Sequence, residues 1–111
     1  FKRFDSAIKQ NIDLLPLDLK GMNIVSNFGI PLLFKNTQLF EKYKNLFIEN
    51  NIEIRQIIAG DIPKQPFLKG HIFYKCELKN TEFISRNGFY FGNNPELNED
   101  EIQRILTLLT K

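Results

Sequence analysis

The chain has 111 residues, which is the length of one domain and too short for two cores of ordinary size. Hydrophobic residues make up 42% of it and charged residues 25%, as in average globular proteins, so intrinsic disorder and fibrous repeats are excluded. The longest apolar runs are far shorter than the roughly 20 residues that cross a bilayer. We therefore expect a single domain over residues 1–111 without a membrane-spanning helix.

The charge and the cysteine content exclude several classes of partner and site. Fifteen basic and 13 acidic residues are interspersed and give a net charge of +2, so no strong field attracts nucleic acid or an anionic membrane. Cys76 and His71 are the only residues of their kinds, which excludes an intrachain disulfide and a zinc or iron–sulfur site of Cys and His within the chain. A reducing, cytoplasmic location fits this composition best. Because the chain opens at Phe1 without an apolar signal core, we interpret it as part of a longer protein.

The N-terminal third predicts a helix, a loop and a strand. Phe1, Phe4, Ile8 and Ile12 recur at spacings of three and four, as on one face of an amphipathic helix. Residues 28–35 then form an apolar run typical of a strand. Pro31 lies within this run and lacks an amide donor, so the strand is expected at a sheet edge or the proline at its first position.

The middle of the chain has the clearest periodicity. An amphipathic helix is expected between Asn36 and Asn50, with one apolar stripe formed by Leu39, Phe40, Tyr43, Leu46 and Phe47. Residues 52–58 then alternate with period two, which predicts a strand. One of its faces carries Ile52, Ile54 and Ile58, and the other carries Glu53 and Arg55.

The C-terminal part contains a long loop and three short elements. Residues 60–70 are rich in glycine and proline and are expected to be a loop, residues 73–78 are ambiguous, and residues 81–85 predict a short helix. An aromatic strand is expected over residues 89–91. Asn98 followed by Glu101 resembles a capping box that starts a last helix, with a buried stripe of Ile102, Ile105, Leu106 and Leu109.

This order of elements predicts an α/β (α+β) fold, with a small sheet and helices packed mainly on one of its faces. We expect one shared core that contains Phe40, Tyr43, Phe47, Ile54, Ile102 and Leu106.

Most patterns that could carry chemistry have a simpler structural explanation. The run from Gly88 to Phe91 weakly resembles an RNA-stacking motif, but the basic face that such a module needs is missing, so a role in the core is favoured. His71 and Cys76 could form a nucleophile and base, but no third group is placed to orient them. The glycines do not have the spacing of a phosphate-binding loop.

Arg55 is the strongest candidate for a binding residue. It follows an alternating strand and precedes the loop that contains Asp61 and Gln65. A cation at a strand end beside a loop is well placed to bind an anionic or carbonyl group. The alternative is a surface arginine that pairs with Glu53 or Asp61, and spacing alone favours this alternative.

The run from Ile52 to Pro66, with Arg55 and then Ala-Gly-Asp and Gln-Pro, resembles a known family. It is similar to the C-terminal small domain of the DegT/DnrJ/EryC1/StrS family of pyridoxal-phosphate-dependent sugar aminotransferases, and within it to the CDP-4-dehydro-6-deoxyglucose 3-dehydrase branch. Residues 28–31, the helix after them, and residues 89–97 before a Glu-rich helix occur in the same order as in that family. Asp61 stands where the family usually has Asn, and Asn94 where His is common.

The resemblance implies a fold-type I enzyme whose N-terminal large domain lies upstream and holds pyridoxal phosphate or pyridoxamine phosphate. The small domain would pack against that domain, help to close a cleft for a nucleotide sugar, and belong to a homodimer that acts in deoxy- or amino-sugar synthesis for surface polysaccharide or lipopolysaccharide. By itself it would bind no cofactor and be inactive. The resemblance marks five candidates for cleft-side contacts: Arg55, Asp61, Gln65, Asn93 and Asn94. The alternative is a stand-alone α/β ligand-binding or protein-interaction module without catalytic activity.

Overall fold

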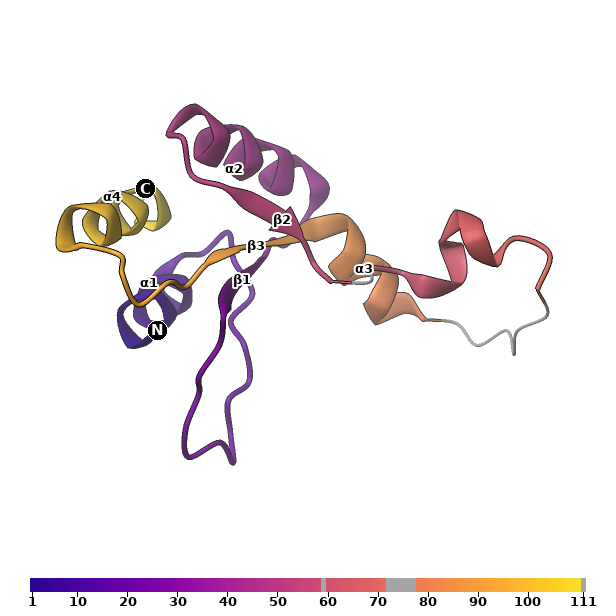
Figure 1. The fold of residues 1–111 in the computed structure, drawn as a ribbon, viewed down its shortest axis with the longest axis horizontal. Helices are drawn as coiled ribbons and strands as arrows, with labels where there is room; N and C mark the ends of the chain where they lie inside the picture. The colour runs from indigo at the N-terminus through magenta and orange to yellow at the C-terminus, as the bar shows by residue number, and fades with distance from the viewer. Residues whose placement is uncertain (59, 72–77, 111) are drawn as a thin grey trace.

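The computed structural model describes residues 1–58, 60–71 and 78–110 and has an α+β fold (Figure 1). The described α-helices are α1 (Lys2–Gln10), α2 (Thr37–Glu49), α3 (Lys79–Asn87) and α4 (Glu99–Leu109), and two 3₁₀ turns, η1 (Ile62–Lys64) and η2 (Pro66–Leu68), lie in the expected loop before α3. The described strands are β1 (Gly29–Leu33), β2 (Ile54–Gln56) and β3 (Gly88–Gly92). The predicted α+β class is confirmed. All but Leu78 of the ambiguous segment 73–78 lies outside the described residues.

The three strands form an antiparallel sheet in the order β1-β3-β2, so the last strand in the sequence is the central one. Tyr90 of β3 lies opposite Pro31 of β1 on one side and opposite Arg55 of β2 on the other. β1 is therefore an edge strand, where a residue without an amide hydrogen is tolerated. This confirms the position predicted from Pro31.

One face of the sheet carries the hydrophobic core. Side chains alternate between the faces of a strand, and Ile30, Leu32, Phe89 and Phe91 are all buried on the same face. Helices α1, α2 and α4 contribute most of the rest of this cluster, namely Phe4, Ala7, Ile8, Tyr43, Phe47, Ile105, Leu108 and Leu109, and Leu14 and Phe34 complete it from outside the helices. Three of the four described helices thus pack on one face, as predicted. Helix α3 instead runs directly into the start of β3 (Figure 1).

Aromatic rings fill the centre of this core. Phe89 has ring centroids 5.2 Å from Phe34 and 5.4 Å from Phe47, and Phe91 lies 5.2 Å from Phe4 in an edge-to-face arrangement. Edge-to-face and tilted pairs of this kind add to the hydrophobic gain from burial. The central strand is therefore attached to α1 and α2 through its two phenylalanines.

Two helix starts follow the predicted chemistry. The Asn36 side chain accepts a hydrogen bond from the Leu39 amide, 2.9 Å away, and caps α2. Asn98 and Glu101 form a reciprocal capping box at the start of α4, with bonds of 3.0 and 2.9 Å. Both caps satisfy amides that a helix leaves without internal partners.

The core prediction needs correction in α4. Ile105 and Leu109 are buried as expected, but Leu108 is the third buried residue, while Ile102 and Leu106 are only half-buried. Leu108 lies three residues after Ile105 and so on the same side of the helix, but only two residues after Leu106 and so on a different side. The side of α4 that carries Ile105 and Leu108 therefore faces the core. Phe40 and Ile54, also expected in the core, likewise pack against it half-buried.

The bounds of several elements also differ from the prediction. Helix α1 ends at Gln10, so Ile12, expected on its apolar face, lies outside it and is 82% exposed. β2 is limited to Ile54–Gln56 instead of residues 52–58, because the chain leaves the sheet after Gln56. As a result Ile58, expected to share a face with Ile54, is 64% exposed. The helix predicted over residues 81–85 is longer at both ends, Lys79–Asn87.

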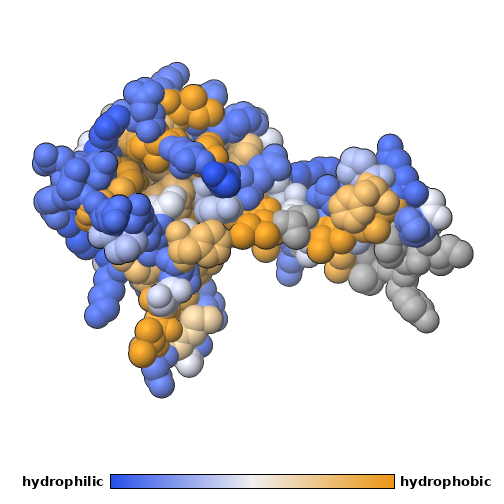
Figure 2. Space-filling view, in the orientation of Figure 1, coloured by the Kyte–Doolittle hydropathy of each residue, from blue (hydrophilic) through white to orange (hydrophobic). Residues whose placement is uncertain are grey.

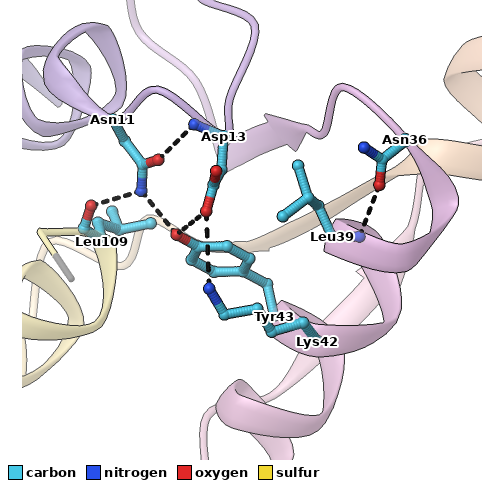
Figure 3. Close-up of polar contacts among 7 residues, drawn as sticks. All are labelled: Asn11, Asp13, Asn36, Leu39, Lys42, Tyr43 and Leu109. Atoms are coloured by element: carbon cyan, nitrogen blue, oxygen red, sulfur yellow. Dashed lines mark hydrogen bonds and ion pairs between the residues drawn. The ribbon is translucent and has the colours of Figure 1, made fainter.

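A polar cluster joins the two ends of the chain to α2 (Figure 3). The Asn11 amide donates to the Tyr43 hydroxyl at 2.9 Å and to the Leu109 carbonyl at 2.6 Å, while Tyr43 donates to Asp13 at 3.1 Å. The Lys42 ammonium lies 3.7 Å from the same Asp13 carboxylate. Burial raises the pKa of Tyr43, which therefore stays a neutral hydrogen-bonding group at ordinary pH.

Two segments project from this core: residues 16–28, and residues 57–71 apart from residue 59, which lies outside the described residues (Figure 1). The Cα radius of gyration is 15.5 Å, compared with about 13 Å for a compact domain of this length. Both projections expose large apolar side chains, including Ile24, Phe28, Ile58 and Phe67. Figure 2 shows orange, hydrophobic areas on both projecting parts. Within the described residues, no helix combines the length and apolar character needed to cross a membrane.

A matched pair of substitutions tests the assignment of core and projection. Phe47→Ala removes a fully buried ring and should lower the free energy of unfolding by about 3 to 5 kcal/mol. Phe67→Ala removes a ring that is 73% exposed and should change it by no more than about 0.5 kcal/mol. Urea unfolding followed by circular dichroism measures both values. Equal losses for the two variants would show that the packing described above is wrong.

Candidate functional site

The face of the sheet opposite the core carries the main candidate site. Pro31, Tyr90 and Arg55 alternate with the buried residues of their strands and point to this face, and none of them is buried. At the end of the sheet that leads to α4, a hollow of about 460 Å³ opens beside them. We call it the sheet-end hollow; it is lined by Phe28, Glu53, Arg55, Tyr90, Asn94 and Arg104, among others.

Two aromatic rings form one wall of the sheet-end hollow. Phe28 meets Tyr90 edge to face, with ring centroids 5.5 Å apart and an angle of 79° between the planes. Tyr90 lies so close over Gly29 that a Cβ at this position would be 2.6 Å from its Cδ2 atom. Residue 29 must therefore lack a side chain for the Tyr90 ring to rest against the backbone of β1.

Arg55 contributes a fixed positive charge to the sheet-end hollow. Its Nε and Nη2 atoms donate to Glu53 Oε1 at 2.9 and 2.7 Å, and its side chain is 68% exposed. The hydrogen bond and charge of Glu53 raise the pKa of Arg55, so the guanidinium is charged at every ordinary pH. This pairing is the alternative that spacing favoured. The ion pair is exposed, so an incoming anion could compete for the guanidinium at little cost.

Arg104 and Asn94 supply further polar groups to the same hollow. Arg104 in α4 donates through Nη2 to the carbonyl of Asn50, at the turn between α2 and β2. Asn94 accepts a hydrogen bond from the Glu96 amide at 3.0 Å through its side-chain oxygen. That bond fixes the Asn94 side chain at the rim and leaves its amide nitrogen as a donor.

Asn93 has a structural position although it is adjacent to Asn94. Its backbone amide donates to the Phe28 carbonyl at 2.9 Å, and its side-chain amide donates to the Asn27 carbonyl at 2.7 Å. Both bonds tie the end of the 16–28 projection to the end of β3. Asn93 thereby holds Phe28 beside Tyr90 instead of lining the hollow itself.

Asp61 and Gln65 lie in a second place, at the base of the 57–71 projection. The buried carboxylate of Asp61 is 3.0 Å from the Lys64 ammonium, which also contacts Glu82 of α3 at 2.9 Å. Arg86 pairs with the same Glu82 at 2.8 Å. We call Asp61, Lys64, Glu82 and Arg86 the arm-base cluster. Together with Gln65 and Ser85, they surround a hollow of about 150 Å³, the arm-base hollow.

Charge pairing within the arm-base cluster shifts two pKa values. The hydrogen bond from Lys64 lowers the pKa of Glu82, with the charges of Lys64 and Arg86 adding to the effect. The pKa of Lys64 is raised, first by its bond to Glu82 and then by its bond to Asp61. Lys64 is therefore protonated and doubly paired, and it joins the projection to α3.

The five residues marked by the family resemblance are thus divided between two places. The sheet-end hollow contains Arg55 and Asn94, and the arm-base hollow contains Asp61 and Gln65. Asn93 supports the first of these from behind.

Three residues that line the sheet-end hollow, Tyr90, Phe28 and Arg104, are not indicated as site residues by the sequence patterns. Tyr90 could have been found, because the residue between two core phenylalanines of one strand must point to the opposite face. Phe28 and Arg104 reach the sheet-end hollow only through the tertiary fold, which no local pattern of the sequence reports.

The other chemical candidates find little support in the described residues. These residues contain no group of three His, Cys, Asp or Glu side chains that could hold a metal ion. His71 is exposed and its backbone amide donates to the Leu68 carbonyl at 3.1 Å. Cys76 lies outside the described residues, so the pairing of these two remains a hypothesis from sequence.

The sequence matches no protein-family model and no curated protein. The family resemblance therefore stands on the motifs quoted from the sequence.

The arm-base cluster predicts a pH dependence of the 57–71 projection. Because the pKa of Glu82 is lowered from 4.5, its pairing with Lys64 is complete above pH 4.5 and is lost as pH falls through the lowered value. The raised pKa of Lys64 protects the same pair on the alkaline side until pH exceeds 10.5. Proteolysis within residues 57–71 should therefore accelerate at acid pH well before the core unfolds.

An acid-stable protease and mass spectrometry of the fragments measure this effect between about pH 2.5 and 7. Glu82→Gln should give the fast cleavage already at pH 7, whereas Glu41→Gln, which breaks a pair within α2, should not. A cleavage rate in the projection that does not change with pH, or that Glu82→Gln leaves unaltered, would contradict the assignment.

Proposed function

We propose that this chain is the C-terminal small domain of a pyridoxal- or pyridoxamine-phosphate-dependent enzyme that acts on a nucleotide sugar, as an aminotransferase or a 3-dehydrase. In this proposal the domain packs against an N-terminal large domain of the same protein and helps to close the substrate cleft, normally in a cytoplasmic homodimer. The product would enter the synthesis of a surface polysaccharide. The position of Arg55 on the uncovered face of the sheet, beside the sheet-end hollow, is the observation that carries the proposal.

The sheet-end hollow supports a binding role for that face. It combines an aromatic wall of Phe28 and Tyr90 with two guanidinium groups and the amide of Asn94. A few polar groups on a largely apolar wall are typical of sites for small organic ligands. Arginine is well suited to phosphate and carboxylate groups because its guanidinium offers paired donors in a fixed plane.

The two projections support packing against another protein body. They expose Ile24, Phe28, Ile58 and Phe67 by 64 to 85%, and monomeric proteins rarely leave so many large apolar side chains uncovered together. Phe28 belongs both to a projection and to the wall of the sheet-end hollow. A large domain that covered the projections would therefore also border the hollow, as closure of a cleft requires.

The residues around the sheet-end hollow and the arm-base hollow do not supply the lysine that the covalent cofactor site of such an enzyme needs. Imine formation needs a lysine that can lose its proton, which burial away from other charges favours. Lys64 borders the arm-base hollow but is held protonated between Asp61 and Glu82. None of the described residues that line the sheet-end hollow is a lysine. The proposal therefore assigns the cofactor to the upstream domain and no covalent step to this chain.

The isolated chain gives a direct test of this assignment. Titration with pyridoxal phosphate should produce no stoichiometric imine absorbance and no borohydride-trapped adduct at any one lysine, because the contacts that hold the cofactor lie elsewhere in the proposal. Free lysine at equal concentration serves as the control for nonspecific imine. A specific, stoichiometric adduct would overturn the assignment. The upstream sequence of the gene supplies the complementary test: a segment with a cofactor-binding lysine or histidine supports the proposal, and its absence refutes it.

Arg55→Ala in the full-length protein tests the binding role. Loss of a charge-assisted contact should cost roughly 1.5 to 3 kcal/mol, which is about ten- to a hundredfold in kcat/KM with a nucleotide sugar. The melting temperature should change little, because the Arg55–Glu53 pair is exposed. Arg3→Ala is the matched control, since Arg3 forms a similar exposed pair with Glu99 at 2.8 Å and does not border the sheet-end hollow. Equal effects of the two variants on turnover would contradict the proposal.

A further inference from the structure

The two edges of the sheet differ in how they are protected. On the outer side of β1, the segment around Leu14 and Leu15 pairs with the strand end, with the Leu15 amide 2.8 Å from the Leu33 carbonyl, and Pro31 removes one donor. On the outer side of β2, no strand pairs with Ile54–Gln56 within the described part of the chain. An unpaired strand edge exposes backbone groups to which another strand can bind.

The charges at the start of β2, on Arg55 and on Glu53 just before the strand, do not protect its edge. Proteins usually discourage strand addition with a charge of one sign, often lysine, on the edge strand. Here the two charges, Glu53 and Arg55, neutralise each other through their own ion pair. Glu53 lies one residue before Ile54 and Arg55 one residue after it, and the two charges have opposite signs.

This arrangement is complementary to itself. If two copies of β2 pair antiparallel about a two-fold axis at Ile54, residue 53 of each copy lies opposite residue 55 of the other. Each Glu53 then faces the Arg55 of the partner copy, and Ile52 faces Gln56. The two intrachain ion pairs are exchanged for two ion pairs between the copies, so no charge is left without a partner.

A groove of mixed polar and apolar lining lies beside the same edge and offers further area. It runs between α2, β2 and the end of α3; Phe40, Ile48, Ile54 and Phe89 supply its apolar lining, and Glu41, Lys44, Gln56 and Arg86 are among its polar residues. Ile48 is 55% exposed although it is next to the buried Phe47. Side chains on the core face of a second β2, above all its Ile54, would extend over this groove and cover it.

We propose that two copies of this chain associate through their β2 edges, with the two-fold axis at Ile54, and join their sheets into one continuous antiparallel sheet. The Arg55 guanidinium stays on the uncovered face in this arrangement and remains beside the sheet-end hollow. Glu53 of the partner copy replaces Glu53 of the same chain as its partner. The inference is independent of the proposed enzymatic role.

Charge reversal tests the pairing, with the dissociation constant measured by sedimentation equilibrium on the 111-residue chain. Glu53→Arg or Arg55→Glu alone places like charges opposite each other twice, so each should raise the dissociation constant at least about tenfold. The double variant, E53R with R55E, restores opposite charges at both places and should return it to within about threefold of the original. Arg3→Glu, which breaks the exposed pair between α1 and α4, should have no effect.

Three outcomes would overturn the proposal: a wild-type chain that is monomeric up to about 1 mM, single variants that associate as tightly as wild type, or a double variant that fails to recover. Circular dichroism of each variant at a dilution where all are monomeric shows whether folding has changed. At that dilution no two copies are paired, so a change in folding seen there comes from loss of the intrachain ion pair and not from loss of the contact between copies.

A disulfide tests the position of the axis. In a Cys76→Ser background, Ile54→Cys brings two thiols together across the axis, where the Cα atoms of opposite residues are about 4.5 to 5.5 Å apart and can be bridged. Gln56→Cys places its two thiols about 13 Å apart, four residues along the strand, and should not crosslink. Crosslinking of Gln56→Cys in preference to Ile54→Cys would show that the register is wrong.

Discussion

The alternation of side chains along β3 is the constraint on which both the core and the candidate site depend. Phe89 and Phe91 must face the helices, because they are the rings that bring α1 and α2 onto the sheet. Their parity forces Tyr90 to the other face, together with Pro31 and Arg55, which lie opposite it. A slip of β3 by one residue would bury the tyrosine and expose both phenylalanines. Packing of the core thus determines which side chains border the sheet-end hollow.

The start of β3 transmits this constraint to α3 and to the 57–71 projection. A Cβ on Gly88 would lie 2.9 Å from the Ile84 carbonyl and 3.2 Å from the Ile57 side chain, so only glycine lets the helix run into the strand without an intervening loop. Helix α3 therefore leaves the sheet in a fixed direction. Because Lys64 binds Glu82 of this helix, the base of the projection is positioned by the same strand that positions Tyr90.

Local patterns predicted what depends on neighbours in sequence. The proline in β1, the capping box at Asn98 and the stripe through Tyr43 and Phe47 each reflect a rule within one element, and the structure agrees with them. The burial of Leu108 depends on how α4 turns against α1 and the sheet, which no single element specifies. The grouping of Arg55 and Asn94 depends on the pairing of β2 with β3, and the sequence carries no separate signal for it.

The exposed 16–28 projection and the sheet-end hollow meet at one residue, Phe28. Phe28 is the last residue before β1 and is 71% exposed, yet it packs on Tyr90 and borders the sheet-end hollow. Asn93 holds it there through the backbone, so Phe28 keeps this position while the rest of the 16–28 projection has few contacts with the core. Segments with so few buried contacts open at much lower free energy than the core does. A large domain that covered the projection, as in the proposed enzyme, would therefore contact the wall of the hollow through Phe28 and would not need to change the aromatic core.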